Sequence, residues 1–163
     1  MSRKVQPLIY IVDKNRSYRN VIISCLKALK LTNIKTFDDG EQCYASSQRS
    51  ADLIILDYNL GKENWTGIEF MEEYSRLHSN TSFLFLSSFT GIETAVKAIR
   101  KGALDYILKS KTGLVRLVKQ LEGYKQFHTK SRREKLMRLT LMGLIITLTT
   151  LTTFMSFYYL NHS

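Results

Sequence analysis

Five short runs of residues, most of them apolar, alternate along the chain with segments of helical spacing. The runs occupy residues 7–12, 34–37, 53–56, 83–86 and 106–108. Each run ends at a polar residue or a turn, which predicts a strand. The central run is uninterrupted Leu and Ile, a pattern typical of a parallel strand that is buried on both faces.

Helical segments separate these runs. Thr66 and Thr90 each stand three residues before a glutamate, Glu69 and Glu93, and this is the spacing of a capping box at the start of a helix. Elsewhere apolar residues recur every three or four positions, which predicts amphipathic helices. The five expected helices cover residues 18–29, 41–48, 66–77, 90–101 and 114–124.

The order of these elements predicts the fold. Strands and helices alternate, and every connection is long enough for a right-handed crossover, so we expect an α/β domain with a doubly wound, five-stranded parallel sheet. The carboxyl ends of parallel strands meet at one edge of such a sheet, where function is concentrated. That edge should collect four polar residues that follow or end strands: Asp13, Asp57, Ser87 and Lys109.

A long uncharged segment runs from Leu139 to Leu160. As a helix, its 22 residues would extend about 33 Å, enough to cross a bilayer core of about 30 Å. A buried core helix is the alternative, although such helices seldom run this far without an ionisable group. The composition therefore predicts one membrane-spanning helix over residues 139–160.

The net charge of +10 is distributed unevenly. Residues 116–138 contain eight Lys or Arg and two Glu. Such a segment can meet nucleic acid phosphates, lipid headgroups or water. Its position beside the uncharged segment favours anionic headgroups over nucleic acid, and basic flanks lie on the cytoplasmic side of a membrane. This predicts that residues 1 to about 135 are cytoplasmic.

Four short motifs at the strand ends, together with Gly102-Ala103-x-Asp105-Tyr106, resemble the receiver domain of bacterial response regulators. The spacings from Asp57 to Ser87 and to Lys109 are those expected for that family. The resemblance covers residues 7 to about 125. The motifs are Val12-Asp13, Leu56-Asp57, Leu86-Ser87 and Asp105-Tyr106-Ile107-Leu108-Lys109.

The resemblance implies a role for each matched residue. A carboxylate at Asp57 can attack phosphorus in line and hold the product as an aspartyl phosphate. The ammonium of Lys109 and the hydroxyl of Ser87 would meet the negative charge on the transferring group. The donor would be a phosphohistidine on a histidine kinase or a phosphotransfer protein. Ser87 and Tyr106 would be the switch residues, with Ser87 moving toward the phosphoryl group and Tyr106 turning inward.

Lys14 departs from the family pattern. Response regulators usually carry two adjacent acids after the first strand, and the second holds Mg²⁺ together with the phosphoacceptor and a backbone carbonyl. Here the corresponding donors would be Asp13, Asp57 and the carbonyl of Asn59, while Lys14 offers no acceptor. This places Mg²⁺ binding in doubt. Lys14 is expected either to pair with Asp57 or to extend into solvent.

The sequence thus predicts three parts: a receiver domain at 5–126, a basic juxtamembrane segment at 127–138 and a membrane span at 139–160. The leading hypothesis is a response regulator, not an enzyme, in the bacterial inner membrane, which signals through an unidentified membrane or cytoplasmic protein. The alternative is a pseudo-receiver that binds its partner without phosphorylation. A phosphatase with an aspartyl nucleophile is disfavoured, because such enzymes place a second Asp where this chain has Asn59.

Overall fold

The computed structural model describes residues 6–46, 49–60 and 65–161. Its sheet has five parallel strands in the order β2-β1-β3-β4-β5, as the sequence predicts. The central position of β3 buries it between β1 and β4, which explains its uninterrupted Leu and Ile. The strands are β1 Ile9–Val12, β2 Ile34–Phe37, β3 Leu53–Leu56, β4 Ser82–Ser87 and β5 Asp105–Leu108.

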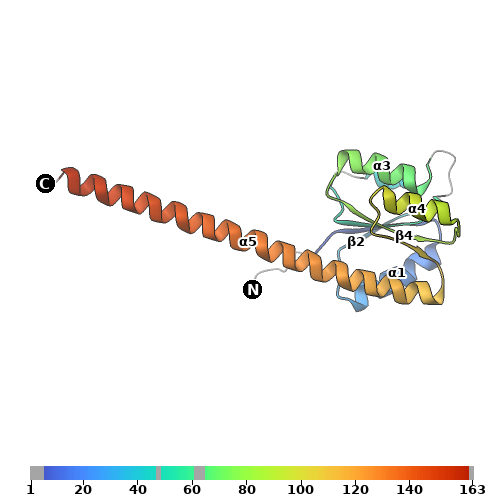
Figure 1. Cartoon of the computed structure of the whole chain (residues 1–163). Helices are drawn as coiled ribbons and strands as arrows, with labels where there is room; N and C mark the ends of the chain where they lie inside the picture. Colours follow the sequence, from blue (N-terminus) through green and yellow to red (C-terminus); the bar gives the residue numbers. More distant parts are fainter. Residues whose placement is uncertain (1–5, 47–48, 61–64, 162–163) are drawn as a thin grey trace. The chain divides into compact units, whose positions relative to one another are not determined.

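Five helices connect and cover the strands. Figure 1 shows α3 and α4 over one face of the sheet, and α1 with the first turns of α5 over the other. This is the doubly wound arrangement that the alternation of elements predicts. The helices are α1 Arg16–Ala28, α2 Gly40–Ala45, α3 Gly67–Leu77, α4 Ile92–Arg100 and α5 Lys111–Asn161.

The core lies on both faces of the sheet, because successive strand residues point to opposite sides. On the α3 face, Phe70 and Tyr74 pack in one cluster with alternate strand residues such as Tyr10 and Phe85. On the other side, α1 and α5 contribute wholly buried side chains, which are Ile22, Leu26, Leu117 and Leu121. Burial of a large apolar side chain contributes roughly 1.5–3 kcal/mol, so these helices are integral to the domain.

One of the two expected capping boxes forms. The Thr66 hydroxyl accepts a 3.3 Å hydrogen bond from the amide of Glu69, whose carboxylate accepts a 2.7 Å bond from the amide of Thr66. The prediction for Thr90 is wrong, because α4 begins at Ile92 with Gly91 as its N-cap and no side-chain cap. Thr90 therefore stands one position too early to cap the helix.

The chain divides into two compact units, Met1–Glu122 and Gly123–Ser163. The first contains the sheet, its covering helices and the beginning of α5. Among the described residues, one helix is long and apolar enough to cross a membrane, judged by its length and composition alone, and it covers Lys111–Phe157. None of its most apolar stretch is buried inside the protein.

Candidate functional site

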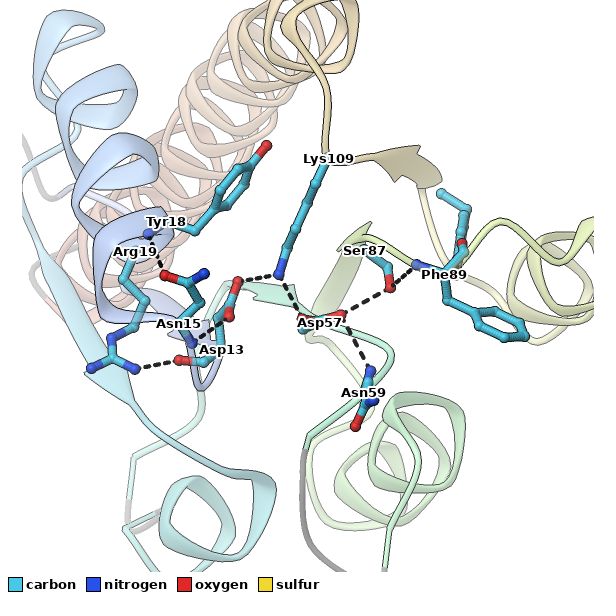
Figure 2. A network of polar contacts seen from close by, with 10 residues as sticks. Asp13, Asn15, Tyr18, Arg19, Asp57, Asn59, Ser87, Phe89 and Lys109 are labelled. Atoms are coloured by element: carbon cyan, nitrogen blue, oxygen red, sulfur yellow. Dashed lines mark hydrogen bonds and ion pairs between the residues drawn. The ribbon is translucent and has the colours of Figure 1, made fainter.

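The four polar residues expected at one edge of the sheet do lie together there (Figure 2). Asp13 follows β1, Asp57 follows β3, Ser87 ends β4 and Lys109 follows β5. Both carboxylates are buried, with 2% of Asp13 and 6% of Asp57 exposed. Two buried acids this close need a compensating positive charge.

Lys109 supplies that charge. Its Nζ lies 2.7 Å from Asp13 Oδ2 and 2.5 Å from Asp57 Oδ2, and 8% of its side chain is exposed. Burial alone would lower the pKa of Lys109, but the hydrogen bonds and charges of the two carboxylates outweigh it and raise the pKa above its ordinary value. Lys109 is therefore a permanent cation at neutral pH, shared between both acids.

The remaining carboxylate oxygens are also engaged. Asp57 Oδ1 accepts a 2.9 Å bond from Ser87 Oγ and a 3.2 Å bond from the amide of Asn59. Asp13 Oδ1 accepts a 2.8 Å bond from the amide of Asn15. All four oxygens of the two acids thus accept hydrogen bonds from the protein.

Lys14 does not join this network. The residue is exposed and makes no ion pair in the part of the chain that the structure describes. Of the two outcomes expected from sequence, the structure therefore favours extension into solvent over pairing with Asp57. The buried cation of the site is Lys109, directly after β5, and not the residue at the position of the missing acid.

The expected switch residues are joined by the turn after β4. Tyr106 is 8% exposed, stacks on Phe85 with ring centroids 5.7 Å apart, and donates a 2.9 Å hydrogen bond to the carbonyl of Phe89. The amide of Phe89 in turn donates a 3.1 Å bond to Ser87 Oγ. Burial raises the pKa of Tyr106. Tyr106 therefore lies inward, and Ser87 already touches Asp57.

Two residues at the start of α1 belong to the site although the sequence did not single them out. The ring centroid of Tyr18 lies 5.0 Å from the Nζ of Lys109. Arg19 donates to the carbonyl of Asp13 and forms a 2.5 Å ion pair with Asp38. Their only sequence signal is position, because the first turn of α1 directly follows a strand end at the functional edge.

Asp105 forms a second polar cluster away from Asp57. Its buried carboxylate accepts bonds of 2.8 and 2.5 Å from the Arg116 guanidinium and 2.9 Å from the amide of Gln120. Bidentate pairing of this kind fixes both orientation and distance. Arg116 therefore anchors α5 to β5, although the sequence analysis counted it only among the basic residues of 116–138.

The structure brings Asp57, Ser87 and Lys109 together at the carboxyl edge of a parallel α/β sheet, which is the arrangement that the resemblance to receiver domains implies. The family model "Response regulator receiver domain" matches residues 9–122. The chain thus belongs to the response regulator receiver family, as the resemblance of its motifs predicts. Receiver domains act in two-component phosphorelays and are signalling domains rather than enzymes.

Individual relatives agree with this assignment. The chain is 28% identical over 102 residues to the transcriptional regulatory protein ZraR of Escherichia coli O157:H7, a match that covers 62% of this chain and 22% of ZraR. The receiver domain of NtrX from Brucella abortus is 28% identical, with a TM-score of 0.64, over 72% of this chain and 98% of that domain. The BeF3-activated receiver domain of DrrB, at 21% identity, has the same fold, with a TM-score of 0.64 over 74% of this chain and 97% of that one.

Receiver domains typically bind Mg²⁺ in their acidic pocket, but the donors described here do not fit that ion. Mg²⁺ requires an octahedron of oxygen ligands. Asp13 and Asp57 are the acids available, and Lys109 holds an oxygen of each. The third expected donor, the carbonyl of Asn59, is a neutral oxygen and adds no negative charge to balance the cation, while the amide of the same residue donates to Asp57. No group of three or more His, Cys, Asp or Glu suited to a metal occurs among the described residues.

Proposed function

We propose that this protein is a membrane-anchored response regulator whose Asp57 accepts a phosphoryl group and whose output is contact with another protein. The observation that carries the proposal is the placement of Asp57 2.5 Å from the Lys109 ammonium and 2.9 Å from the Ser87 hydroxyl. A nucleophilic carboxylate, a fixed cation and a hydroxyl donor meet at one point. These are the groups that phosphoryl transfer to a carboxylate needs.

The transfer starts from a phosphohistidine on a histidine kinase or a phosphotransfer protein. A carboxylate oxygen of Asp57 attacks phosphorus, and a new O–P bond forms as the N–P bond to imidazole breaks. The electron pair of the broken bond stays on the imidazole nitrogen, which then takes up a proton. The product is an aspartyl phosphate and a neutral histidine.

Lys109 and Ser87 stabilise this reaction without chemical change. Negative charge spreads over the equatorial oxygens of the transferring group, and a cation fixed beside Asp57 offsets it. Because its Nζ also bonds Asp13, Lys109 stays at the site while Asp57 is modified. Ser87 can turn its hydroxyl from Asp57 to a phosphoryl oxygen with a small rotation.

Membrane attachment is proposed for residues 139–160, with the receiver on the cytoplasmic side of the bacterial inner membrane. The absence of charge over this segment and the exposure of its described apolar side chains support the proposal. The basic residues at 127–138 would bind anionic headgroups, each contributing about 1 kcal/mol near such a surface. The partner recognised there would be a protein rather than nucleic acid.

A second candidate function is a binding module that works without phosphorylation. Two observations favour it: Ser87 already bonds Asp57, and Tyr106 is already inward, bonded to Phe89. The family resemblance attaches this arrangement to the phosphorylated form. In the second candidate, the protein would hold this arrangement of Ser87 and Tyr106 at all times, without phosphorylation.

Intact mass of the detergent-solubilised full chain, after incubation with acetyl phosphate, separates the two candidates. A phosphoryl adduct in the wild type and in the control variant Asp38→Asn, but not in Asp57→Asn, is the expected result. Parallel samples with Mg²⁺ and with a chelator measure any metal requirement. An unmodified wild type under both conditions would favour the second candidate.

Extraction of membranes at alkaline pH tests the anchor. The full chain should stay with the membrane pellet, and a variant with Ile145→Lys and Leu148→Lys should move to the supernatant, because charge at the bilayer centre opposes insertion. Release of the wild type together with the variant would contradict the proposed span.

A further inference from the structure

The aromatic ring of Tyr18 lies against the buried ammonium of Lys109. Its centroid is 5.0 Å from Nζ, inside the range of about 6 Å in which a cation is attracted to a ring face. Figure 2 shows the ring beside the ammonium, with the Tyr18 hydroxyl pointing away from the two carboxylates. The contact joins α1 to the residue that follows β5.

The turn before α1 fixes this ring and one carboxylate at the same time. The side chain of Asn15 caps α1 by accepting a 3.1 Å bond from the amide of Tyr18. The amide of Asn15 donates a 2.8 Å bond to Asp13 Oδ1. The same turn therefore holds Asp13 and Tyr18, both of which contact Lys109.

The hydroxyl of Tyr18 does not explain its position. That oxygen is buried and has no hydrogen-bond partner among the described residues, which is an unfavourable arrangement for a polar group. The aromatic ring is therefore the part of the side chain that can attract the Lys109 ammonium. An ammonium has three N–H donors, and Lys109 directs two bonds to Asp13 and Asp57, so the ring can cover what remains.

We propose that Tyr18 is a positioning residue whose ring holds Lys109 between Asp13 and Asp57, where the ammonium meets the incoming phosphoryl group. The inference deepens the proposed phosphoryl acceptance on Asp57 and depends on it. Position 14 is a lysine, so the second acid that the family usually carries there is not available to contact the Lys109 ammonium. The Tyr18 ring restrains Lys109 in its place. Tyr18 acts through Lys109 and touches no reacting atom.

Two substitutions separate the ring from the hydroxyl. Tyr18→Leu keeps an apolar side chain and removes the aromatic face, whereas Tyr18→Phe keeps the face and removes the buried hydroxyl. The initial rate of phosphorylation of the full chain by acetyl phosphate should fall about tenfold in Tyr18→Leu and stay within about twofold of wild type in Tyr18→Phe. An equal fall in both variants would overturn the inference.

A second readout does not depend on phosphorylation. With carbon-13 lysine in the full chain, the ε-methylene signal of Lys109 carries the ring-current shift of Tyr18, and Lys109→Gln identifies the signal by its loss. The signal should keep its shift in Tyr18→Phe and lose it in Tyr18→Leu. A slower Tyr18→Leu with an unchanged Lys109 signal would overturn the inference, because the ring would not act through Lys109.

The two readouts also distinguish a failure of this inference from a failure of the proposed function. If no variant and no wild-type chain takes up phosphate, phosphoryl acceptance fails, and the Lys109 signal alone decides. Loss of its shift in Tyr18→Leu and retention in Tyr18→Phe would still establish the contact between ring and ammonium on which the positioning role rests. An identical signal in all three proteins would refute it.

Discussion

The hydroxyl of Tyr106 donates a 2.9 Å hydrogen bond to the carbonyl oxygen of Phe89. This bond links β5 to the turn after β4, and the amide of Phe89 continues the link to Ser87. The chain of contacts therefore runs from Asp57, the proposed phosphoacceptor, through Ser87 and Phe89 to Tyr106, the expected switch residue.

Tyr106→Phe should cut this link and release the turn. We expect a loss of about 1 kcal/mol in the free energy of unfolding and faster hydrogen exchange at the amide of Phe89. Tyr10→Phe is the matched control, because Tyr10 also donates to a backbone carbonyl, that of Arg49, at 2.8 Å. It should cost similar stability without changing exchange at Phe89, and equal exchange in both variants would contradict the link.

The sheet and the site edge could be predicted because their signals are local and repeated. Each strand is a short run ended by a polar residue, and parallel topology then brings all the strand ends to one edge. Their positions at strand ends therefore identify three site residues, Asp57, Ser87 and Lys109. The structure places each of these residues within hydrogen-bond reach of another. Their catalytic and switch roles stay predictions, as do the limits of the three segments along the chain.

The contacts that were missed depend on geometry that the sequence does not encode locally. By sequence, Tyr18 is an ordinary member of the apolar face of α1. Its contact with Lys109 arises only because the fold brings α1 next to the end of β5. Arg116 looks like part of a basic segment until β5 places Asp105 beside it. Thr90 shows the reverse case, since a correct capping-box spacing fails when the helix begins one residue late.

Lys14 is the residue that we expect to limit metal binding. Lys14→Asp would restore a second acid next to Asp13 and supply a third carboxylate, so Mg²⁺ affinity measured by calorimetry should rise at least about tenfold. Lys119→Asp makes the same change of charge on an exposed position of α5 and should leave the affinity near that of the wild type. Equal affinities in the wild type and Lys14→Asp would show that the lysine does not limit the site.

Arg116 should matter for stability more than its exposure suggests. Arg116→Ala leaves the buried carboxylate of Asp105 with one fewer partner, and we expect a loss of about 1–3 kcal/mol in the free energy of unfolding. Lys119→Ala, an exposed change on the same helix, should stay within about 0.5 kcal/mol of wild type. Denaturant titrations compare the two, and matching midpoints would argue against an anchoring role.

Stability should fall at alkaline pH. Burial raises the pKa of the Cys43 thiol from an ordinary value of 9.0 to about 12, and burial also raises the pKa of Tyr74 to about 12. Between the ordinary and raised values the folded chain binds more protons than the unfolded chain, so stability decreases as pH rises. We expect Cys43 to account for about 1 kcal/mol between pH 8.5 and 10.

Denaturant unfolding at a series of pH values measures this slope. Cys43→Ala should be less stable overall, because it leaves a small cavity, but its stability should depend less on pH between 8.5 and 10. A wild-type stability that stays constant over this range would contradict a thiol held neutral by burial.

Chemical trapping of an aspartyl phosphate gives the sharpest test of whether Asp57 accepts a phosphoryl group. Borohydride reduces an acyl phosphate to a primary alcohol, so phosphorylated Asp57 becomes homoserine, which peptide mass mapping of the full chain can locate. After incubation with a phosphodonor, we expect homoserine at position 57 and unchanged aspartate at positions 13 and 38. Aspartate retained at position 57, or conversion at another position instead, would contradict phosphoryl acceptance by Asp57.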